Sequence, residues 1–171
     1  MIRKIFVFIS LSISVFALSF DYETFEANFV QSIKNKSGKK IVYSGKVIAK
    51  KPNYALWEYT KPVKKSVYVN NDTVIIYEPL LSQAKYLKKK NSVSLDAILK
   101  KAKPEGNDEY SAKDGDITYK FKVKDNMIER LTYKDSLEND TEIVFSERKK
   151  NSPVSQKTFE FTPSADIDII K

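Results

Sequence analysis

The sequence contains no cysteine and no histidine, and it has few glycines, four in 171 residues. Without cysteine the chain has no disulfides, no thiol nucleophile and no thiol for lipid attachment. Without histidine it lacks the usual general base of serine and cysteine hydrolases and the commonest transition-metal ligand. No glycine-rich loop that would cradle a phosphate is present either. We therefore expect no metal and no cofactor, and most hydrolase chemistries are disfavoured.

Residues 1–19 have the pattern of a cleaved signal peptide. Arg3 and Lys4 form a short basic start, an apolar run follows to Ala17, and small residues precede the expected cleavage site. The apolar run is shorter than the roughly 20 residues that a membrane-spanning helix needs. Residues 20–171 match one domain of ordinary size, and no later segment is long or apolar enough to cross a bilayer. We expect the mature protein outside the cytoplasm.

Basic residues exceed acidic ones, with 30 Lys plus Arg against 22 Asp plus Glu. Such an excess suits nucleic acid or an anionic membrane surface. Export argues against nucleic acid, and the lysines are scattered along strand faces rather than gathered on one helix. We therefore expect no nucleic-acid partner and interpret the excess chiefly as a solvated basic surface.

The spacing of apolar residues predicts helices in two places. Residues 21–38 place aromatic and aliphatic side chains three and four residues apart, which indicates an amphipathic helix. These side chains belong to Tyr22, Phe25, Phe29 and Ile33. A second helix is predicted between Ser92 and Lys103, with Ser94 as its cap and Pro104 beyond its end. Its apolar side is formed by Leu95, Ile98, Leu99 and Ala102.

Elsewhere apolar and polar residues alternate, which is typical of strands with one buried face. Strands are predicted at residues 41–49, 54–59, 66–69, 73–77, 84–87, 117–123, 127–133, 141–147 and 155–161. The polar stretch PEGNDEYSAKDGD, residues 104–116, is interpreted as turn. Together these elements predict an α+β fold, a curved antiparallel sheet or partly open barrel with a few helices packed on one face.

Candidate catalytic groups are sparse. The acidic pairs Asp108 with Glu109 and Asp114 with Asp116 have the residue type that hydrolyses glycosidic bonds. A solvated loop explains them better, and no Gly-x-Ser-x-Gly motif is present. By contrast the chain has 10 Tyr, 10 Phe and one Trp, many at alternating strand positions that face the helices. A plain hydrophobic core accounts for any single one, whereas the set also fits a cavity for an apolar ligand on the concave side of a curved sheet.

Several short motifs occur in a fixed order along the chain. They are FEANFVQ at 25–31, KPNYALWEY at 51–59 with Pro62, YEP at 77–79 with Gln83, a segment at 135–143, FEFTP at 159–163 and DIDII at 166–170. Taken together they resemble the LolA family of periplasmic carriers for outer-membrane lipoproteins. The resemblance covers nearly the whole mature chain.

The resemblance implies an unclosed β-barrel covered by a lid of short helices, which agrees with the pattern of elements above. It also implies a periplasmic chaperone, not an enzyme, that binds the acyl chains of lipoproteins in a hydrophobic cavity and carries them from the inner to the outer membrane. Implied partners are acylated lipoproteins, an inner-membrane ATP-driven lipoprotein-releasing complex and an outer-membrane lipoprotein acceptor. We expect the carrier to be a monomer.

On this resemblance we expect an acyl-binding wall from three parts of the chain. Its residues are Phe25, Phe29 and Ile33 on the first helix, Trp57 and Tyr59 on the sheet, and Leu95, Ile98 and Leu99 on the lid helix. The family's arginine, which ties the barrel rim to the lid in relatives, is Lys51 here. Lysine offers a point charge in place of a planar fork, so we expect a looser or different contact between rim and lid. A neighbouring family phenylalanine is Ala55, and we expect Tyr54 or Leu56 to fill that space.

Other functions remain open at this point. The outer-membrane receptor of the same fold is itself acylated on a cysteine, which this chain lacks. An envelope sensor or regulatory domain of similar fold would bind lipid or misfolded protein and signal to a membrane partner. A glycan hydrolase that uses Asp114 and Asp116 is the most distant alternative.

Overall fold

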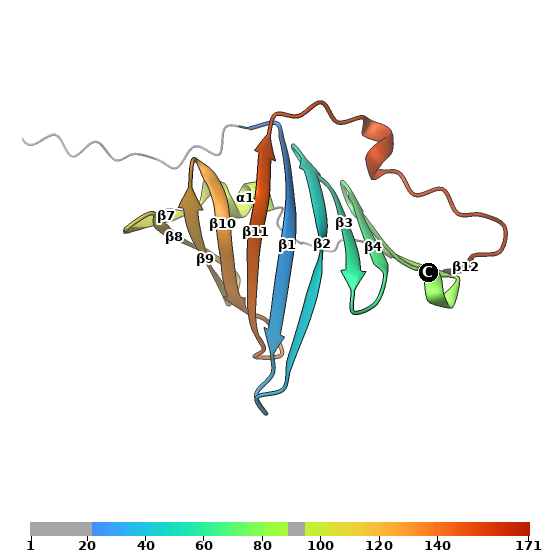
Figure 1. The fold of residues 1–171 in the computed structure, drawn as a ribbon, viewed down its shortest axis with the longest axis horizontal. Helices are drawn as coiled ribbons and strands as arrows, with labels where there is room; N and C mark the ends of the chain where they lie inside the picture. Colours follow the sequence, from blue (N-terminus) through green and yellow to red (C-terminus); the bar gives the residue numbers. More distant parts are fainter. Residues whose placement is uncertain (1–21, 89–94) are drawn as a thin grey trace, which may run out of the picture.

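The computed structural model describes residues 22–88 and 95–171, which form strands, one short α-helix and two 3-10 turns (Figure 1). The strands are β1 (Thr24–Lys34), β2 (Lys40–Lys50), β3 (Tyr54–Lys61), β4 (Lys65–Asn70), β5 (Thr73–Glu78), β6 (Gln83–Lys88), β7 (Lys103–Gly106), β8 (Glu109–Asp114), β9 (Ile117–Lys124), β10 (Met127–Lys134), β11 (Asp140–Lys150) and β12 (Asp168–Ile170). The helical elements are η1 (Pro79–Leu81), α1 (Leu95–Lys100) and η2 (Gln156–Phe159). The expected signal peptide lies outside the described residues.

All the described strands belong to one sheet, in the order β12-β6-β5-β4-β3-β2-β1-β11-β10-β9-β8-β7. Neighbours are antiparallel except β12, which runs parallel to β6. The edge strands β12 and β7 pair with one neighbour each and not with one another, so the sheet stays open. This confirms the predicted unclosed antiparallel sheet.

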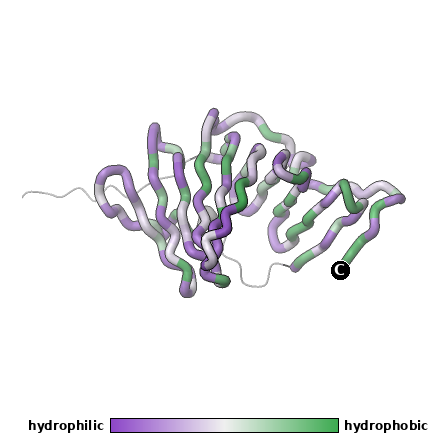
Figure 2. Tube along the Cα trace, turned by 60° about the horizontal axis from the view of Figure 1, so that its bottom comes forward, coloured by the Kyte–Doolittle hydropathy of each residue, from purple (hydrophilic) through white to green (hydrophobic). Residues whose placement is uncertain are grey.

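The sheet curves so that strands from both of its halves supply side chains to a common core. Figure 2 shows hydrophobic and hydrophilic positions interchanging along the strands, as expected when successive residues face opposite sides. The core cluster includes Phe25 and Phe29 from β1, Val47 from β2 and Phe121 from β9, with Trp57 of β3 packed against it. This cluster defines the concave face of the sheet.

Helix α1 lies against the concave face. Its Ile98 and Leu99 are buried in the core cluster, and the helix contacts β8. The connection that contains it joins β6, near one end of the strand order, to β7 at the other edge. A crossing of that kind brings the helix over the open side of the sheet. The predicted helical lid therefore contains, in the described part of the chain, this one α-helix.

A smaller packed layer covers part of the opposite, convex face. After β11 the chain passes to β3 and β4, where Phe159 of η2 is fully buried against Tyr54, with ring centroids 5.7 Å apart. Phe161 follows and packs on Tyr68 at 5.4 Å and on Tyr77 at 5.0 Å. The C-terminal segment thus packs on the convex side of β3, β4 and β5 before β12 pairs with β6.

The predicted first helix is wrong, because residues 24–34 form strand β1. The spacing of four between Phe25, Phe29 and Ile33 fits a helix, but as an even number it also fits a strand. Ala27 and Gln31 decide between the two, because both are buried on the same face as Phe25 and Phe29. Buried side chains therefore recur at every second residue, as in a strand.

Two further predictions were wrong near the C-terminal half. Residues 155–161 form η2 and extended chain, and Ser155 starts the turn by accepting a hydrogen bond from the Lys157 amide at 3.3 Å. The polar stretch 104–116 contains most of β7 and all of β8, in which Ala112 is buried. Its few apolar residues are enough for the edge strand β7 and its neighbour β8, whose exposed positions are polar. The second helix is confirmed as α1, while Ser94 lies outside the described residues.

Gly45 is a point of close approach between strands, where β2 shifts register against β3 between Ser44 and Gly45. A Cβ at this position would collide with the backbone carbonyl oxygen of Glu58 and lie 3.0 Å from Cε1 of Phe29. Glycine inside a strand often marks such an approach of two backbones.

We predict that Gly45→Ala lowers the free energy of unfolding by about 3 kcal/mol, because the carbonyl cannot move without breaking the ladder. Urea unfolding of the mature protein measures this loss. Lys46→Ala is the matched control, since it removes only an exposed ion pair with Glu26 at 3.4 Å and should cost less than about 1 kcal/mol. Equal stability of Gly45→Ala and the wild type would show that the strands do not approach this closely.

Candidate functional site

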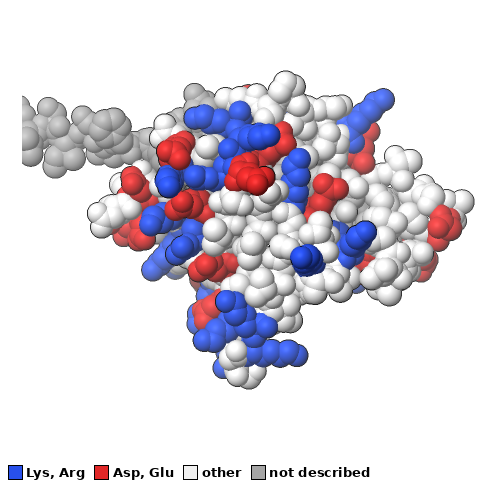
Figure 3. Space-filling model, in the orientation of Figure 1, with Lys and Arg blue, Asp and Glu red and all other residues white. Residues whose placement is uncertain are grey.

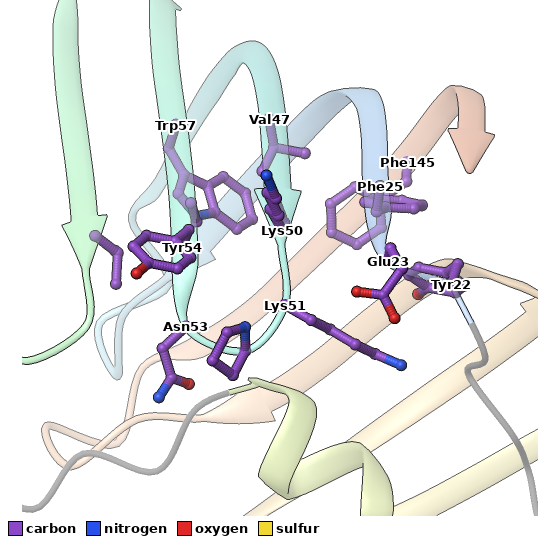
Figure 4. A pocket seen from close by; sticks show the side chains of 14 residues that line it. Tyr22, Glu23, Phe25, Val47, Lys50, Lys51, Asn53, Tyr54, Trp57 and Phe145 are labelled. Carbon is purple, nitrogen blue, oxygen red and sulfur yellow. The ribbon is translucent and has the colours of Figure 1, made fainter. Parts of the chain in front are cut away.

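A pocket of about 220 Å³ lies at the end of the sheet where β1 begins and β2 turns into β3 (Figure 4). The walls come mainly from these three strands. The lining residues are Tyr22, Glu23, Phe25, Val47, Ala49, Lys50, Lys51, Pro52, Asn53, Tyr54, Ala55, Trp57, Val69 and Phe145. Most of these side chains are apolar, and the charged ones belong to residues at strand ends and in the β2–β3 turn.

Aromatic rings form the firm part of the wall. Phe25 meets Phe145 edge to face, with centroids 5.7 Å apart, and Trp57 lies 6.3 Å from Phe145. Behind this layer Phe29 packs edge to face on Trp57 at 5.1 Å. Edge-to-face contacts of this length are favourable beyond simple burial, and they fix the ring planes. The pocket therefore has a preformed apolar wall.

The rim of the pocket is polar. The Lys51 amide donates to the Glu23 carbonyl oxygen at 2.9 Å, which joins the β2–β3 turn to the residue before β1. The Lys50 ammonium donates to the Val154 carbonyl oxygen at 3.3 Å. A further amide bond, from Asn151 to the Thr24 carbonyl at 2.9 Å, holds the C-terminal segment at the same end. Hydrogen bonds that join three parts of the chain thus frame the opening.

One polar atom of the wall is unusual. Oδ1 of Asn53 is buried without a hydrogen-bond partner among the described residues. A buried acceptor left unpaired costs about 1–3 kcal/mol unless water or a bound molecule supplies a donor. A ligand N–H or O–H placed at this atom would satisfy it.

The structure brings together part of the predicted acyl-binding set. Phe25, Trp57 and the predicted rim residue Lys51 line the pocket. Phe29, Ile98 and Leu99 belong to the core cluster around it but do not line it, and Tyr59 packs at the edge of that cluster. Ile33 lies near the other end of β1. Leu95 is the first residue of α1, and its side chain lies outside the described part of the structure.

Sequence reasoning missed several lining residues that its own patterns contained. Val47 and Ala49 share the face of the predicted strand at 41–49, and Phe145 belongs to the strand predicted at 141–147. Extending the alternation from strand to strand would have found them. Ala55 lines the pocket together with Tyr54. Leu56, by contrast, pairs with Tyr68 on the convex side and does not fill the space beside Ala55.

A polar aromatic group lies toward the other end of the concave face. The Tyr59 hydroxyl donates to Oε1 of the buried Gln31 at 3.1 Å, and the Lys65 ammonium lies 4.4 Å from the centre of the Tyr59 ring. Burial, with smaller contributions from Tyr133 and Tyr43, raises the pKa of Tyr59 to about 12. The neutral phenol is therefore the form that the fold stabilises.

This pKa predicts a loss of stability at high pH. The folded-state pKa lies above the ordinary value of 10.0, so the contribution of Tyr59 is complete below pH 10 and is lost as pH rises toward 12. The shift corresponds to about 2 to 3 kcal/mol. We predict that the unfolding free energy of Tyr59→Phe falls less steeply across this range than that of the wild type, as urea unfolding at several pH values would measure. Identical slopes would contradict the assignment.

Groups suited to other chemistry are sparse in the part of the chain that the structure describes. No cluster of three or more His, Cys, Asp or Glu side chains there has the arrangement of a metal site. Asp114 lies 4.0 Å from the Lys101 ammonium, in an ion pair at the surface. Within residues 22–88 and 95–171 no helix has the length and hydropathy needed to cross a membrane.

A curved, unclosed sheet with an apolar pocket at its concave side is a fold typical of proteins that enclose apolar ligands. The profile of the family "Outer membrane lipoprotein carrier protein LolA" matches residues 21–111. An outer-membrane lipoprotein carrier protein of Helicobacter pylori is 37% identical over 150 residues, which cover 87% of this chain and 80% of that protein. The corresponding protein of Wolinella succinogenes is 34% identical, covering 86% and 87%. The chain belongs to the LolA family.

Further comparisons agree. The outer-membrane lipoprotein carrier protein of Campylobacter jejuni is 34% identical over 166 residues, 97% of this chain and 95% of that one. Among solved structures, a LolA superfamily protein from Nitrosomonas europaea superposes with a TM-score of 0.54 at 12% identity, covering 84% of this chain and 93% of that chain. At such low identity the structural match shows the fold alone. It supports the unclosed sheet described above.

Proposed function

We propose that this protein is a periplasmic carrier of lipoproteins, and that its pocket holds acyl chains of the cargo. The observation that carries the proposal is the preformed apolar pocket between β1, β2 and β3 in a chain of the LolA family. Transfer from an inner-membrane ATP-driven releasing complex to an outer-membrane acceptor belongs to the same proposal. Binding and release require no catalytic group, which agrees with the sparse chemistry of the site.

The apolar wall extends beyond the pocket itself. Val69 lines the pocket from β4, and Val67 on the same face pairs with Trp57. The face continues onto β5, where Val74 and Ile76 pair with Val69 and Val67. All four aliphatic side chains are half-buried. An acyl chain longer than the pocket would therefore find further apolar surface along the sheet.

Physical chemistry explains why cargo of this kind needs a carrier. Each buried CH₂ group is worth about 0.8 kcal/mol, so about fourteen methylenes cost roughly 11 kcal/mol to expose to water. Contact with an apolar wall offsets most of this cost during transit. The polar rim at Lys50 and Lys51 suits the boundary between a buried acyl chain and the hydrated polypeptide of the cargo.

The envelope sensor domain is not favoured. Relatives that match most of this chain bear the name of carriers. None of the residues in the acidic pairs considered for a glycan hydrolase lines the pocket. A carrier also explains why the apolar wall stays open at one end of the sheet.

Trp57 provides a direct test, because it is the one tryptophan of the chain and lines the pocket. We predict that a diacylated lipopeptide with brominated acyl chains quenches the fluorescence of Trp57, whereas the same lipopeptide without bromine does not. Bromine quenches only at contact distance, so the signal reports an acyl chain inside the pocket. Absence of quenching at saturating lipopeptide would contradict the proposed acyl site.

Two matched variants locate the site. Val69→Glu places a carboxylate on the pocket wall, where a charge beside an acyl chain is poorly solvated, so lipopeptide affinity should fall at least about tenfold. Val30→Glu introduces the same charge on the convex face of β1, where Val30 is 49% exposed, and should bind as the wild type does. An equal loss in both variants would place the binding site elsewhere.

A further inference from the structure

Exposed aliphatic side chains gather at the end of the sheet opposite the pocket. The turns β1–β2, β3–β4, β5–β6, β8–β9 and β10–β11 all lie at this end, because each joins antiparallel strands that run away from the pocket and back. Three of these turns display large apolar side chains to solvent. The residues and their exposed fractions are Val63 50%, Leu80 76%, Leu81 64% and Leu137 74%.

Lysines are concentrated in the β1–β2 and β3–β4 turns, the second of which carries Val63. The stretches 34–42 and 60–66 contain no acidic residue, and their lysines are Lys34, Lys36, Lys39, Lys40, Lys61, Lys64 and Lys65. Figure 3 shows basic atoms concentrated on the projecting tip where Figure 1 places the β1–β2 hairpin. Ile41 and Val42, directly after this tip, are 41% and 48% exposed. We call this end, made by the five turns, the distal end.

The charge of the distal end is not uniform. The β8–β9 turn contains Asp116 and follows Asp114, which pairs with Lys101 at 4.0 Å. The β10–β11 turn also carries acidic residues, of which Asp135 accepts hydrogen bonds from the amides of Leu137 and Asn139, both at 2.9 Å. Lys134 pairs with Asp140 at 3.5 Å. Among the described residues no carboxylate pairs with Lys36, Lys39 or Lys64. The excess of free positive charge is thus centred on the β1–β2 and β3–β4 turns.

We propose that the distal end docks on the surface of a lipid bilayer that contains anionic headgroups. Single aliphatic side chains on separate turns do not make the continuous area of about 800 Å² that each partner of a stable protein complex buries. A bilayer surface accepts such side chains one by one at the acyl boundary, while lysines beside them meet the headgroup phosphates. Lysine stems can lie along the apolar region and leave their ammonium groups at that level.

Docking in this way leaves the pocket free. The pocket opens where β2 turns into β3, at the other end of the same strands, and none of the distal turns contributes a residue to its lining. Membrane docking and acyl binding therefore use separate residues. The inference extends the proposed function but does not rest on it, since it concerns the cargo-free protein and a lipid surface.

Vesicle binding tests the proposal. Mature protein without cargo should sediment with phosphatidylcholine vesicles that contain phosphatidylglycerol and not with pure phosphatidylcholine. Binding should be lost near 1 M salt, where the Debye length is about 3 Å. Replacing Lys36, Lys39 and Lys64 together by Gln should weaken binding about a hundredfold, since each lysine near an anionic surface contributes roughly fivefold.

A matched triple replacement separates a docking surface from general basicity. Lys122, Lys124 and Lys149 are exposed lysines outside the distal turns, and their change to Gln removes the same charge. This control should bind vesicles nearly as the wild type does. An equal loss in both triple variants, or no binding of the wild type to anionic vesicles at low salt, would overturn the proposal in favour of a solvated basic surface.

The aliphatic side chains have their own test. Val63→Ser with Leu80→Ser should weaken binding to anionic vesicles at least about tenfold, because both side chains leave the apolar boundary. Val30→Ser removes a similarly exposed valine from the middle of the convex face and should have no effect. If the double variant binds anionic vesicles as the wild type does, the proposal that these turns insert into the bilayer surface is wrong. If brominated lipopeptide still quenches Trp57 in each variant, the loss of vesicle binding is not caused by a loss of acyl binding.

Discussion

The structure depends on the curvature of one continuous sheet, because the sheet must bury apolar side chains without a second sheet to pack against. Curvature brings β1, β2 and β3 into the same core as β8 to β11, and aromatic contacts close the space between them. Phe29 of β1 is central to this arrangement, because its ring reaches across β2 to Trp57 at 5.1 Å and Tyr59 at 5.0 Å, both on β3. Gly45 permits this packing, because it has no side chain at the point where β2 closely approaches the backbone of β3.

Curvature also leaves the concave face unevenly covered. Over β8 to β11 the face is filled by core side chains and by α1, whereas over β4 and β5 its valines and isoleucine stay half-buried in the described structure. The pocket lies between these two regions, bounded by Phe145 on the filled side and Val69 on the open side. An apolar site of this kind therefore follows from the shape of the sheet and needs no specialised loop.

The sequence predicted most strands because alternation over five or more residues is a strong signal, as in the hairpin of β9 and β10. It failed where one spacing fits two structures, since Phe25, Phe29 and Ile33 recur every four residues. Family resemblance led to Phe25, Lys51 and Trp57, which line the pocket. It did not distinguish lining residues from those one layer behind, such as Phe29 and Leu99, because that difference depends on how far the sheet curves.

The up-and-down order of the strands separates two kinds of surface along the length of the molecule. Successive turns alternate between the two ends of an antiparallel sheet, so residues in the β2–β3 turn and residues in the β1–β2 and β3–β4 turns always lie on opposite ends. Lys50 and Lys51 consequently frame the pocket, whereas Lys36, Lys39 and Lys64 project from the distal end. The basic residues therefore include two separate groups at opposite ends of the sheet. One part borders the pocket through backbone and side-chain bonds, and the other remains available to anions in the surroundings.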